Sequence, residues 1–291
     1  MKEKNGKIKD YFSLVKFSHT VFAMPFALIG YFLAVQHEGY SFTLRSFILV
    51  LLCMVFARTA AMAFNRYVDR EIDASNPRTA FREIPAGIIR PRSAIHLVMI
   101  SSLLFMICTS FINPLVLKLS PVALAVVLGY SFTKKFTSLS HFVLGLGLSL
   151  APIGAYLAVT AHFALLPLIY SLIVMLWVGG FDIIYALQDE DFDKNERLKS
   201  VPVLLGRKRA MFLSSVVHTF AAVLVVGAGI MAGFGWIYWL GSVIFIGLLA
   251  YQHFIISPKD ISRLNVAFFT TNGLASIIFA IFVVAEMYLH R

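Results

Sequence analysis

The chain has 291 residues, of which 59% are hydrophobic and only 14% are charged. Soluble domains usually carry charge on about a quarter of their residues, so this composition excludes an ordinary soluble domain and indicates a polytopic membrane protein. The net charge of +10 does not indicate a nucleic-acid partner, because the basic residues are confined to alternate loops, as in proteins whose loop charges set membrane topology.

The hydrophobic pattern predicts an all-α bundle of nine transmembrane helices that forms a single membrane-embedded domain over residues 1–291. Each apolar stretch is close to the ~20 residues that a helix needs to cross a bilayer. The predicted spans are 17–36, 44–64, 93–112, 114–132, 139–160, 163–188, 209–233, 235–256 and 265–288. Several connections are only a few residues long, so neighbouring helices must be antiparallel. The segments 65–92 and 189–208 are the long polar connections.

The first span begins near Phe17 and lacks a small-residue cleavage site. It is also long enough to cross the bilayer. We therefore expect a retained helix rather than a signal peptide that is removed.

The Lys and Arg residues predict the orientation of the bundle. With the N-terminus in the cytoplasm, 21 of the 25 Lys and Arg residues lie on the cytoplasmic side. Only Arg45, Lys118 and Arg291 lie outside, and Arg58 lies within a span. Because cytoplasmic loops carry the excess of Lys and Arg, both long polar connections are predicted to be cytoplasmic. The sequence thus predicts a multi-pass protein of the cell (inner) membrane.

Acidic residues are concentrated in two segments, 65–73 and 182–193. Together with Glu83 and Glu196, these segments hold 10 of the 15 Asp and Glu residues. Carboxylates are costly near a bilayer, so their concentration there predicts a cation or another charged partner. Two other interpretations remain: ordinary solvated helix ends, or the ion pathway of a cation-coupled transporter.

The spacing within each segment predicts one polar face per helix. Asn65, Asp69 and Asp73 are four residues apart. Asp182, Tyr185, Asp189 and Asp193 follow at intervals of three, four and four. At 3.6 residues per turn each set forms a stripe. If the stripes face each other across a central cavity open to the cytoplasm, their oxygens can share Mg²⁺ ions with a diphosphate substrate. The predicted metal ligands are Asn65, Asp69, Asp73, Asp182, Asp189 and Asp193.

Basic residues alternate with these acids and are candidates to bind phosphate oxygens. They are Arg66, Arg70, Arg78, Arg82, Lys134, Lys135 and Lys199. For any one of them, the general excess of positive charge in cytoplasmic loops explains its presence equally well.

Arg58 is unusual because it lies inside an apolar span, two helical turns before Asn65. An unpaired guanidinium is costly there, so Arg58 requires an anionic partner. A structural ion pair with an Asp of the first segment and an anchor for a substrate carboxylate both remain open.

The two motifs resemble those of the UbiA superfamily of intramembrane aromatic prenyltransferases. The first family motif, Asn-x-x-x-Asp-x-x-x-Asp, is matched by residues 65–73, and the second, Asp-x-x-Tyr-Ala-x-x-Asp-x-x-x-Asp, by residues 182–193. The likeness continues through residues 73–80, 82–87 and 199–202. It covers the whole chain, and nine spans is the family's architecture.

This resemblance implies Mg²⁺-dependent transfer of a polyprenyl group from polyprenyl diphosphate to an aromatic acceptor. The implied catalytic residues are Asp69, Asp73, Asp189 and Asp193. The implied diphosphate-binding residues are Arg66, Arg82, Lys134 and Lys199. For the acceptor, the implied contacts are Arg58 and Tyr185.

The sequence most resembles the 4-hydroxybenzoate polyprenyltransferase branch of ubiquinone synthesis. It is also similar to members that prenylate 1,4-dihydroxy-6-naphthoate in menaquinone synthesis, and both acceptors carry a carboxylate. Arg66 departs from the ubiquinone-pathway pattern, which often has Asp at this position, so the acceptor stays open between the two. Other family acceptors, haem or a glycerol phosphate ether lipid, are the further alternatives.

Overall fold

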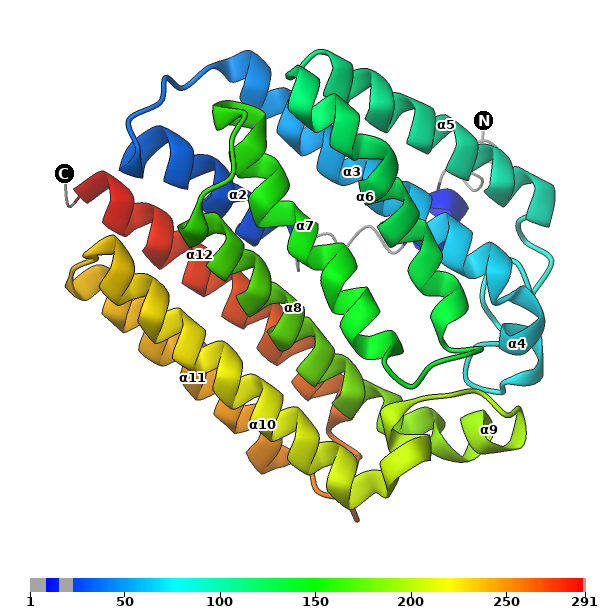
Figure 1. Ribbon diagram of the computed structural model, residues 1–291. Helices are drawn as coiled ribbons and strands as arrows, with labels where there is room; N and C mark the ends of the chain where they lie inside the picture. The colour runs from blue at the N-terminus through cyan, green and yellow to red at the C-terminus, as the bar shows by residue number, and fades with distance from the viewer. Residues whose placement is uncertain (1–8, 16–22, 290–291) are drawn as a thin grey trace.

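The computed structural model describes residues 9–15 and 23–289, and within these ranges the chain is a bundle of long helices (Figure 1). No β-strand occurs in the described residues, where the only β-type pairing is an isolated bridge between Ser257 and Asp260. The helices are α2 (Met24–Phe32), α3 (Leu44–Val68), α4 (Arg70–Ser75), α5 (Pro91–Ser110), α6 (Pro114–Thr133), α7 (Ser140–Thr160), α8 (Leu165–Tyr185), α9 (Glu190–Asn195), α10 (Val201–Ala232), α11 (Trp236–Ile255) and α12 (Asn272–Leu289).

Eight helical segments of the described chain are long and apolar enough to cross a membrane. They agree with eight of the predicted spans, and most of their ends differ from the prediction by only a few residues. The helix Met24–His37, formed by α2 and the π-helical turn η2 (Leu33–His37), is apolar but shorter. The predicted span 17–36 includes residues 16–22, which lie outside the described ranges, so the ninth crossing stays a prediction.

The sequence around the helix starts explains where several helices begin. The side chain of Asn113 accepts a hydrogen bond from the amide of Val116, and Pro114 occupies the first position of α6. Ser200 caps α10 in the same way through the amide of Val203. These side chains satisfy amides that have no partner inside the helix, and proline needs no such partner.

Close helix packing depends on small residues at two crossings. A Cβ atom on Gly30 of α2 would lie 2.0 Å from the carbonyl oxygen of Pro152, and one on Gly145 of α7 would lie 2.4 Å from that of Met175. Apolar lipid provides little hydrophobic driving force between helices, so tight packing holds such a bundle together. At these crossings glycine lets α2 approach α7, and α7 approach α8.

A cluster of buried aromatic side chains fills the centre of the bundle. The ring centroids of Phe26 and Trp177 are 5.3 Å apart, and those of Phe245 and Phe279 are 4.8 Å apart. The indole N–H of Trp177 donates to Oδ1 of Asn272 at 2.9 Å, so this polar group has a partner inside the core.

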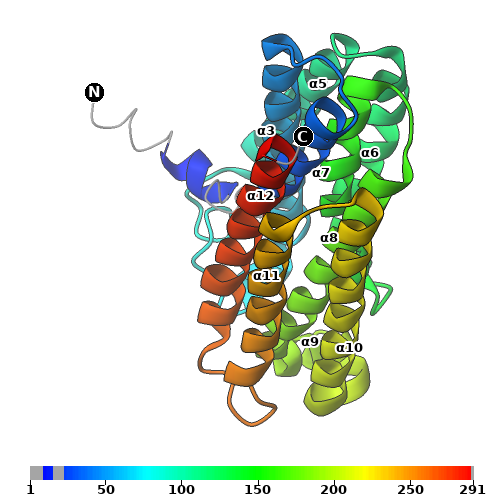
Figure 2. The same ribbon diagram turned by 90° about the vertical axis from the view of Figure 1, so that its left-hand side faces the viewer.

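Both predicted polar stripes are interrupted where the helices leave the bundle. Residue Asp69 separates α3 from α4, and the 3₁₀ turn η3 (Ala186–Asp189) separates α8 from α9. The prediction of two uninterrupted helical faces is therefore wrong in this detail. Figure 1 shows α4 and α9 at the same end of the bundle, which we call the acidic end. Figure 2 shows the C-terminal end of α12 at the other end of the bundle.

Candidate active site

The two acidic segments meet at the acidic end through a loop that follows α4. From this loop, Arg78 donates from Nε to Oδ1 of Asp189 at 2.9 Å and from Nη2 to Oδ2 at 2.6 Å. Asn76 adds a third hydrogen bond, from Nδ2 to Oδ1 of Asp189, at 3.3 Å. A bidentate guanidinium–carboxylate pair fixes both the distance and the orientation of its partners. The first acidic segment is thereby fastened to the second.

Asp73 is buried among arginines, with 5% of its surface exposed. Arg82 donates from Nη1 to Oδ1 of Asp73 at 2.6 Å, and Nη1 of Arg66 lies 4.0 Å from Oδ2. Although Oδ2 is buried, it accepts no hydrogen bond from any described residue.

Asp193 occupies the corresponding position in the second segment and is 1% exposed. The ammonium of Lys134, at the end of α6, donates to Oδ1 at 3.2 Å and lies 3.2 Å from Oδ2. Within the described chain Oδ2 again lacks a hydrogen bond. Each segment thus holds one buried carboxylate oxygen with unused capacity to bind a cation.

Asp69 accepts a hydrogen bond from Nδ2 of Asn65 at 2.8 Å. Burial, together with the negative charge of Asp73, raises the pKa of Asp69 to about 6, although Lys134 and Lys135 oppose this shift. A cation placed near Asp69 and Asp73 would relieve their repulsion.

Asp182 is held by a histidine. Oδ2 of Asp182 lies 2.6 Å from Nδ1 of His141, in the first turn of α7. The other ring nitrogen, Nε2, accepts a hydrogen bond from the amide of Val201 at 3.2 Å.

Tyr185 and Lys199 differ in how close they lie to the acids. The ring of Tyr185 stacks on Phe268 at a centroid distance of 3.9 Å, and its hydroxyl accepts a hydrogen bond from Arg78 at 3.5 Å. Lys199 instead donates its ammonium to the carbonyl of Phe136 at 3.0 Å and forms no ion pair with a described acid.

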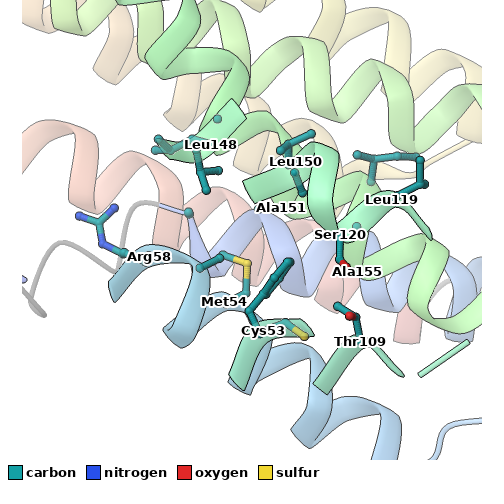
Figure 3. Close-up of a pocket in the computed structure, with 18 of the residues that line it drawn as sticks. Cys53, Met54, Arg58, Thr109, Leu119, Ser120, Leu148, Leu150, Ala151 and Ala155 are labelled. Carbon is teal, nitrogen blue, oxygen red and sulfur yellow. The ribbon is translucent and has the colours of Figure 1, made fainter. Parts of the chain in front are cut away.

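An apolar cavity of about 320 Å³ lies between α3, α6 and α7. Arg58 and Tyr130 are among its lining residues, and Figure 3 shows Arg58 at one end of the cavity and Leu119 and Thr109 at the other. Tyr130 lies near the charged side chains of Asp69, Asp182, Arg58 and Arg66, where the cavity meets the polar site.

Arg58 makes no ion pair with any acid that the structure describes, and its Nε is buried without a hydrogen bond. The structural ion pair with an Asp of the first segment, one of the two interpretations of this residue, is therefore absent from the described chain. An anchor for a substrate anion remains.

The donor atoms at the acidic end suit a hard divalent cation such as Mg²⁺, because they are carboxylate and amide oxygens. In the described ranges, no three His, Cys, Asp or Glu residues converge closely enough to hold a metal ion by themselves. Mg²⁺ is commonly bound by one or two carboxylates together with substrate phosphates, so this arrangement fits a shared site rather than an all-protein cage.

Two residues of the site, Asn76 and His141, were not singled out from the sequence, and Arg78 was expected to bind phosphate rather than to pair with Asp189. Asn76 and Arg78 lie within the segment 73–80 that resembles the family, but spacing cannot tell which of several arginines reaches across to the other acidic segment. His141 carries no local signal, because its partners are 41 and 60 residues away along the chain.

Comparison with known proteins agrees with this architecture. Residues 23–274 match the family model described as UbiA prenyltransferase family. Among curated proteins, 4-hydroxybenzoate octaprenyltransferase from Aliivibrio fischeri is 30% identical over 232 residues, covering 80% of this chain and 81% of that protein. The enzyme of the same name from Paraburkholderia phytofirmans is 31% identical over 227 residues, covering 77% and 78%.

Two solved structures share the fold. A UbiA homologue from Aeropyrum pernix has a TM-score of 0.84 and 32% identity, covering 93% of this chain and 98% of its own. A UbiA homologue from Archaeoglobus fulgidus, bound to DMAPP and Mg²⁺, has a TM-score of 0.73 and 20% identity, covering 96% and 99%. The chain therefore belongs to the UbiA prenyltransferase family and is a multi-pass membrane prenyltransferase.

Proposed function

We propose that this enzyme transfers a polyprenyl group from polyprenyl diphosphate to a 4-hydroxybenzoate-like acceptor in quinone biosynthesis, with Mg²⁺ as cofactor. One observation carries the proposal: two acidic segments joined by Arg78 lie beside an apolar cavity that begins at Arg58 and Tyr130. The names of the curated relatives and the Mg²⁺-bound Archaeoglobus fulgidus homologue support it. The distribution of Lys and Arg supports a position of the acidic end at the cytoplasmic face of the cell (inner) membrane.

The acids of the two segments are proposed as metal ligands together with the diphosphate. The acids are Asp69, Asp73, Asp182, Asp189 and Asp193, and the amide oxygen of Asn65 is proposed as a further ligand. Bound Mg²⁺ would neutralise charge that develops on the leaving diphosphate. The buried Oδ2 atoms of Asp73 and Asp193 support this role, because each lacks a hydrogen bond within the described chain.

The basic side chains around these acids are proposed to bind the diphosphate. Arg66, Arg82 and Lys134 each lie within 4.0 Å of an Asp carboxylate, so a phosphate that bridges to the same acids comes within their reach. Lys199 is further from the acids and would have to leave the carbonyl of Phe136. Preorganised cations stabilise the leaving group as the allylic C–O bond breaks.

The apolar cavity is proposed to hold the isoprenoid next to the breaking bond. Breaking the allylic C–O bond leaves an allylic cation, which water would capture. Aliphatic and aromatic side chains make up most of the cavity wall, so they exclude water while a carbon of the acceptor ring attacks. The attacked carbon then loses its proton to a nearby base, which restores the aromatic ring.

Arg58 and Tyr185 are proposed to bind the acceptor. The buried Nε of Arg58 has no described partner, and a carboxylate would supply one. Both 4-hydroxybenzoate and 1,4-dihydroxy-6-naphthoate carry that group. The naphthoate is the second candidate, because Arg66 stands where ubiquinone-pathway enzymes often have Asp. A cation-coupled transporter fits less well, because the clustered acids of both motifs lie at or beyond the ends of α3 and α8 rather than at mid-span.

A prenyl-transfer assay tests the proposal. Membranes that contain the protein are given radiolabelled polyprenyl diphosphate and each acceptor in parallel, with and without EDTA. We expect label in a prenylated aromatic product of one acceptor, and loss of this product when EDTA removes the metal. Turnover that persists in EDTA would contradict the metal dependence, and transfer to neither acceptor would contradict the proposed substrate class.

A further inference from the structure

His141 connects three helices at the acidic end through a buried side chain that is 1% exposed. It belongs to the first turn of α7, its Nδ1 lies 2.6 Å from Oδ2 of Asp182 at the end of α8, and its Nε2 lies 3.2 Å from the amide of Val201 at the start of α10. Val201 follows the loop that carries Lys199, so the histidine links Asp182 to the residue after this loop.

The two contacts determine where the ring proton lies. A backbone amide can only donate, so Nε2 of His141 must accept the hydrogen bond from Val201 and carries no proton. The proton of the neutral ring is then on Nδ1, which donates to Asp182. Both ring nitrogens are occupied, which leaves His141 neither a lone pair to take a proton from substrate nor a second proton to give.

We propose that His141 is a positioning residue that fixes the carboxylate of Asp182 for ligand binding. Its Nδ1–H occupies Oδ2, and no described residue donates a hydrogen bond to Oδ1, which is left for a ligand. Asp182 also lies near Tyr130, at the boundary between the cavity and the polar site. The inference rests on the proposed function only in taking that ligand to be the Mg²⁺–diphosphate group.

The physical argument concerns the orientation of a metal ligand. The side chain of an aspartate can rotate, so its carboxylate can point away from a bound metal at little energetic cost. A hydrogen bond to one of its oxygens, such as that from His141 to Asp182, restricts this rotation. Residues that hydrogen-bond to metal ligands in this way typically change metal affinity about 10- to 100-fold when they are removed. An ordinary hydrogen bond between membrane helices would change stability alone, so metal affinity separates the two roles.

Two substitutions separate the two hydrogen bonds of His141. In His141→Asn the side-chain amide nitrogen takes the position of Nδ1 and can still donate to Asp182, whereas the bond to Val201 is lost. In His141→Gln the longer side chain can place its carbonyl near the position of Nε2 and accept from Val201, whereas the bond to Asp182 is lost. His162→Gln is the matched control, since His162 lies beyond the opposite end of α7 and bonds to Tyr40.

The experiment measures binding of Mn²⁺, as a paramagnetic substitute for Mg²⁺, by electron paramagnetic resonance in the presence of an unreactive prenyl thiodiphosphate. We expect His141→Gln to weaken Mn²⁺ binding by about 10- to 100-fold, and His141→Asn and the His162 control to bind like wild type. Thermal unfolding should show both His141 variants to be less stable than wild type, because each loses one hydrogen bond between helices, so a loss of stability by itself does not account for weaker Mn²⁺ binding. Equal loss of Mn²⁺ affinity in both His141 variants, or loss in neither, would overturn the proposal.

A second measurement does not depend on the metal. In the full-length protein with ¹⁵N-labelled histidine, the NMR signals of His141, assigned by comparison with the His141→Asn spectrum, should show a neutral ring with its proton on Nδ1. A proton on Nε2 would overturn the inference whatever the Mn²⁺ results. If wild type binds no Mn²⁺ with the thiodiphosphate, the proposed function fails, and the NMR result still decides the role of His141.

Discussion

At the scale of single residues, most of the acids in the two motifs are matched by a partner from a different element. Asp189 of η3 pairs with Arg78, Asp193 of α9 with Lys134, and Asp182 of α8 with His141. Breaking a buried pair by removing one partner leaves the other charge uncompensated, so these acids contribute to structure as well as to ligand binding. Mutants of the site therefore need a check of folding beside every measurement of activity.

Asp69→Ala and Asp189→Ala are each expected to reduce prenyl transfer to background, because the metal-bound diphosphate loses an oxygen ligand. The measurement is turnover in membranes, together with the amount of inserted protein. Asp191→Ala is the matched control, since Asp191 belongs to the second segment but its side chain is 85% exposed. Normal turnover by well-folded Asp69 and Asp189 variants would remove both residues from the mechanism.

Arg58→Leu is expected to raise the KM for a carboxylated acceptor and to leave the KM for the prenyl diphosphate nearly unchanged. Loss of a charge-assisted hydrogen bond corresponds to about 1.5–3 kcal/mol, or roughly a 10- to 100-fold rise in KM. Steady-state kinetics with each substrate varied in turn measure this. Arg45→Leu, at the opposite end of α3, controls for loss of a cation. An effect confined to the diphosphate would reassign Arg58 to that substrate.

At the scale of helices, α7 holds together the two parts of the site. The first turn of α7 carries His141, and its second turn packs through Gly145 against the carbonyl of Met175 in α8. Further side chains of α7 line the apolar cavity. Any increase in the distance between α7 and α8 would move His141 away from Asp182. The packing of α7 against α8 therefore affects both the stability of the bundle and the position of His141 relative to Asp182.

Gly145→Ala is expected to lower thermal stability by several degrees, because the added Cβ would lie 2.4 Å from the Met175 oxygen and must force the helices apart. Overpacking of this kind typically costs about 1–3 kcal/mol. Gly154→Ala in the same helix is the control, since no atom lies within 4 Å of its added Cβ. Thermal unfolding in detergent compares the two variants. Equal stability would show that the crossing is more adaptable than its geometry indicates.

At the scale of the whole molecule, both acidic segments lie at one end of the bundle, and the loop charges predict that this end faces the cytoplasm. The diphosphate and the metal would then be bound from the cytosol, while the cavity lies within the membrane. This orientation follows from the sequence and has a direct test.

A single cysteine at position 191 is expected to react with a membrane-impermeant maleimide in inverted vesicles and not in right-side-out vesicles. The variant is Asp191→Cys in a background in which the free thiols Cys53 and Cys108 are replaced by alanine. Ser41→Cys, in the exposed connection between η2 and α3, should show the opposite pattern. The reverse result for both positions would place the acidic end outside.

The sequence by itself determined the class of fold, eight of the helices and the position of the two acidic segments along the chain, because hydrophobic length and the spacing of acids are local properties of the chain. Only the tertiary structure decided which charges meet. Arg78 reaches Asp189 across 111 residues and His141 reaches Asp182 across 41, and these pairings depend on how the helices pack. The break at Asp69 and the 3₁₀ turn before Asp189 also came from the tertiary structure, since four-residue spacing alone predicts a continuous helix.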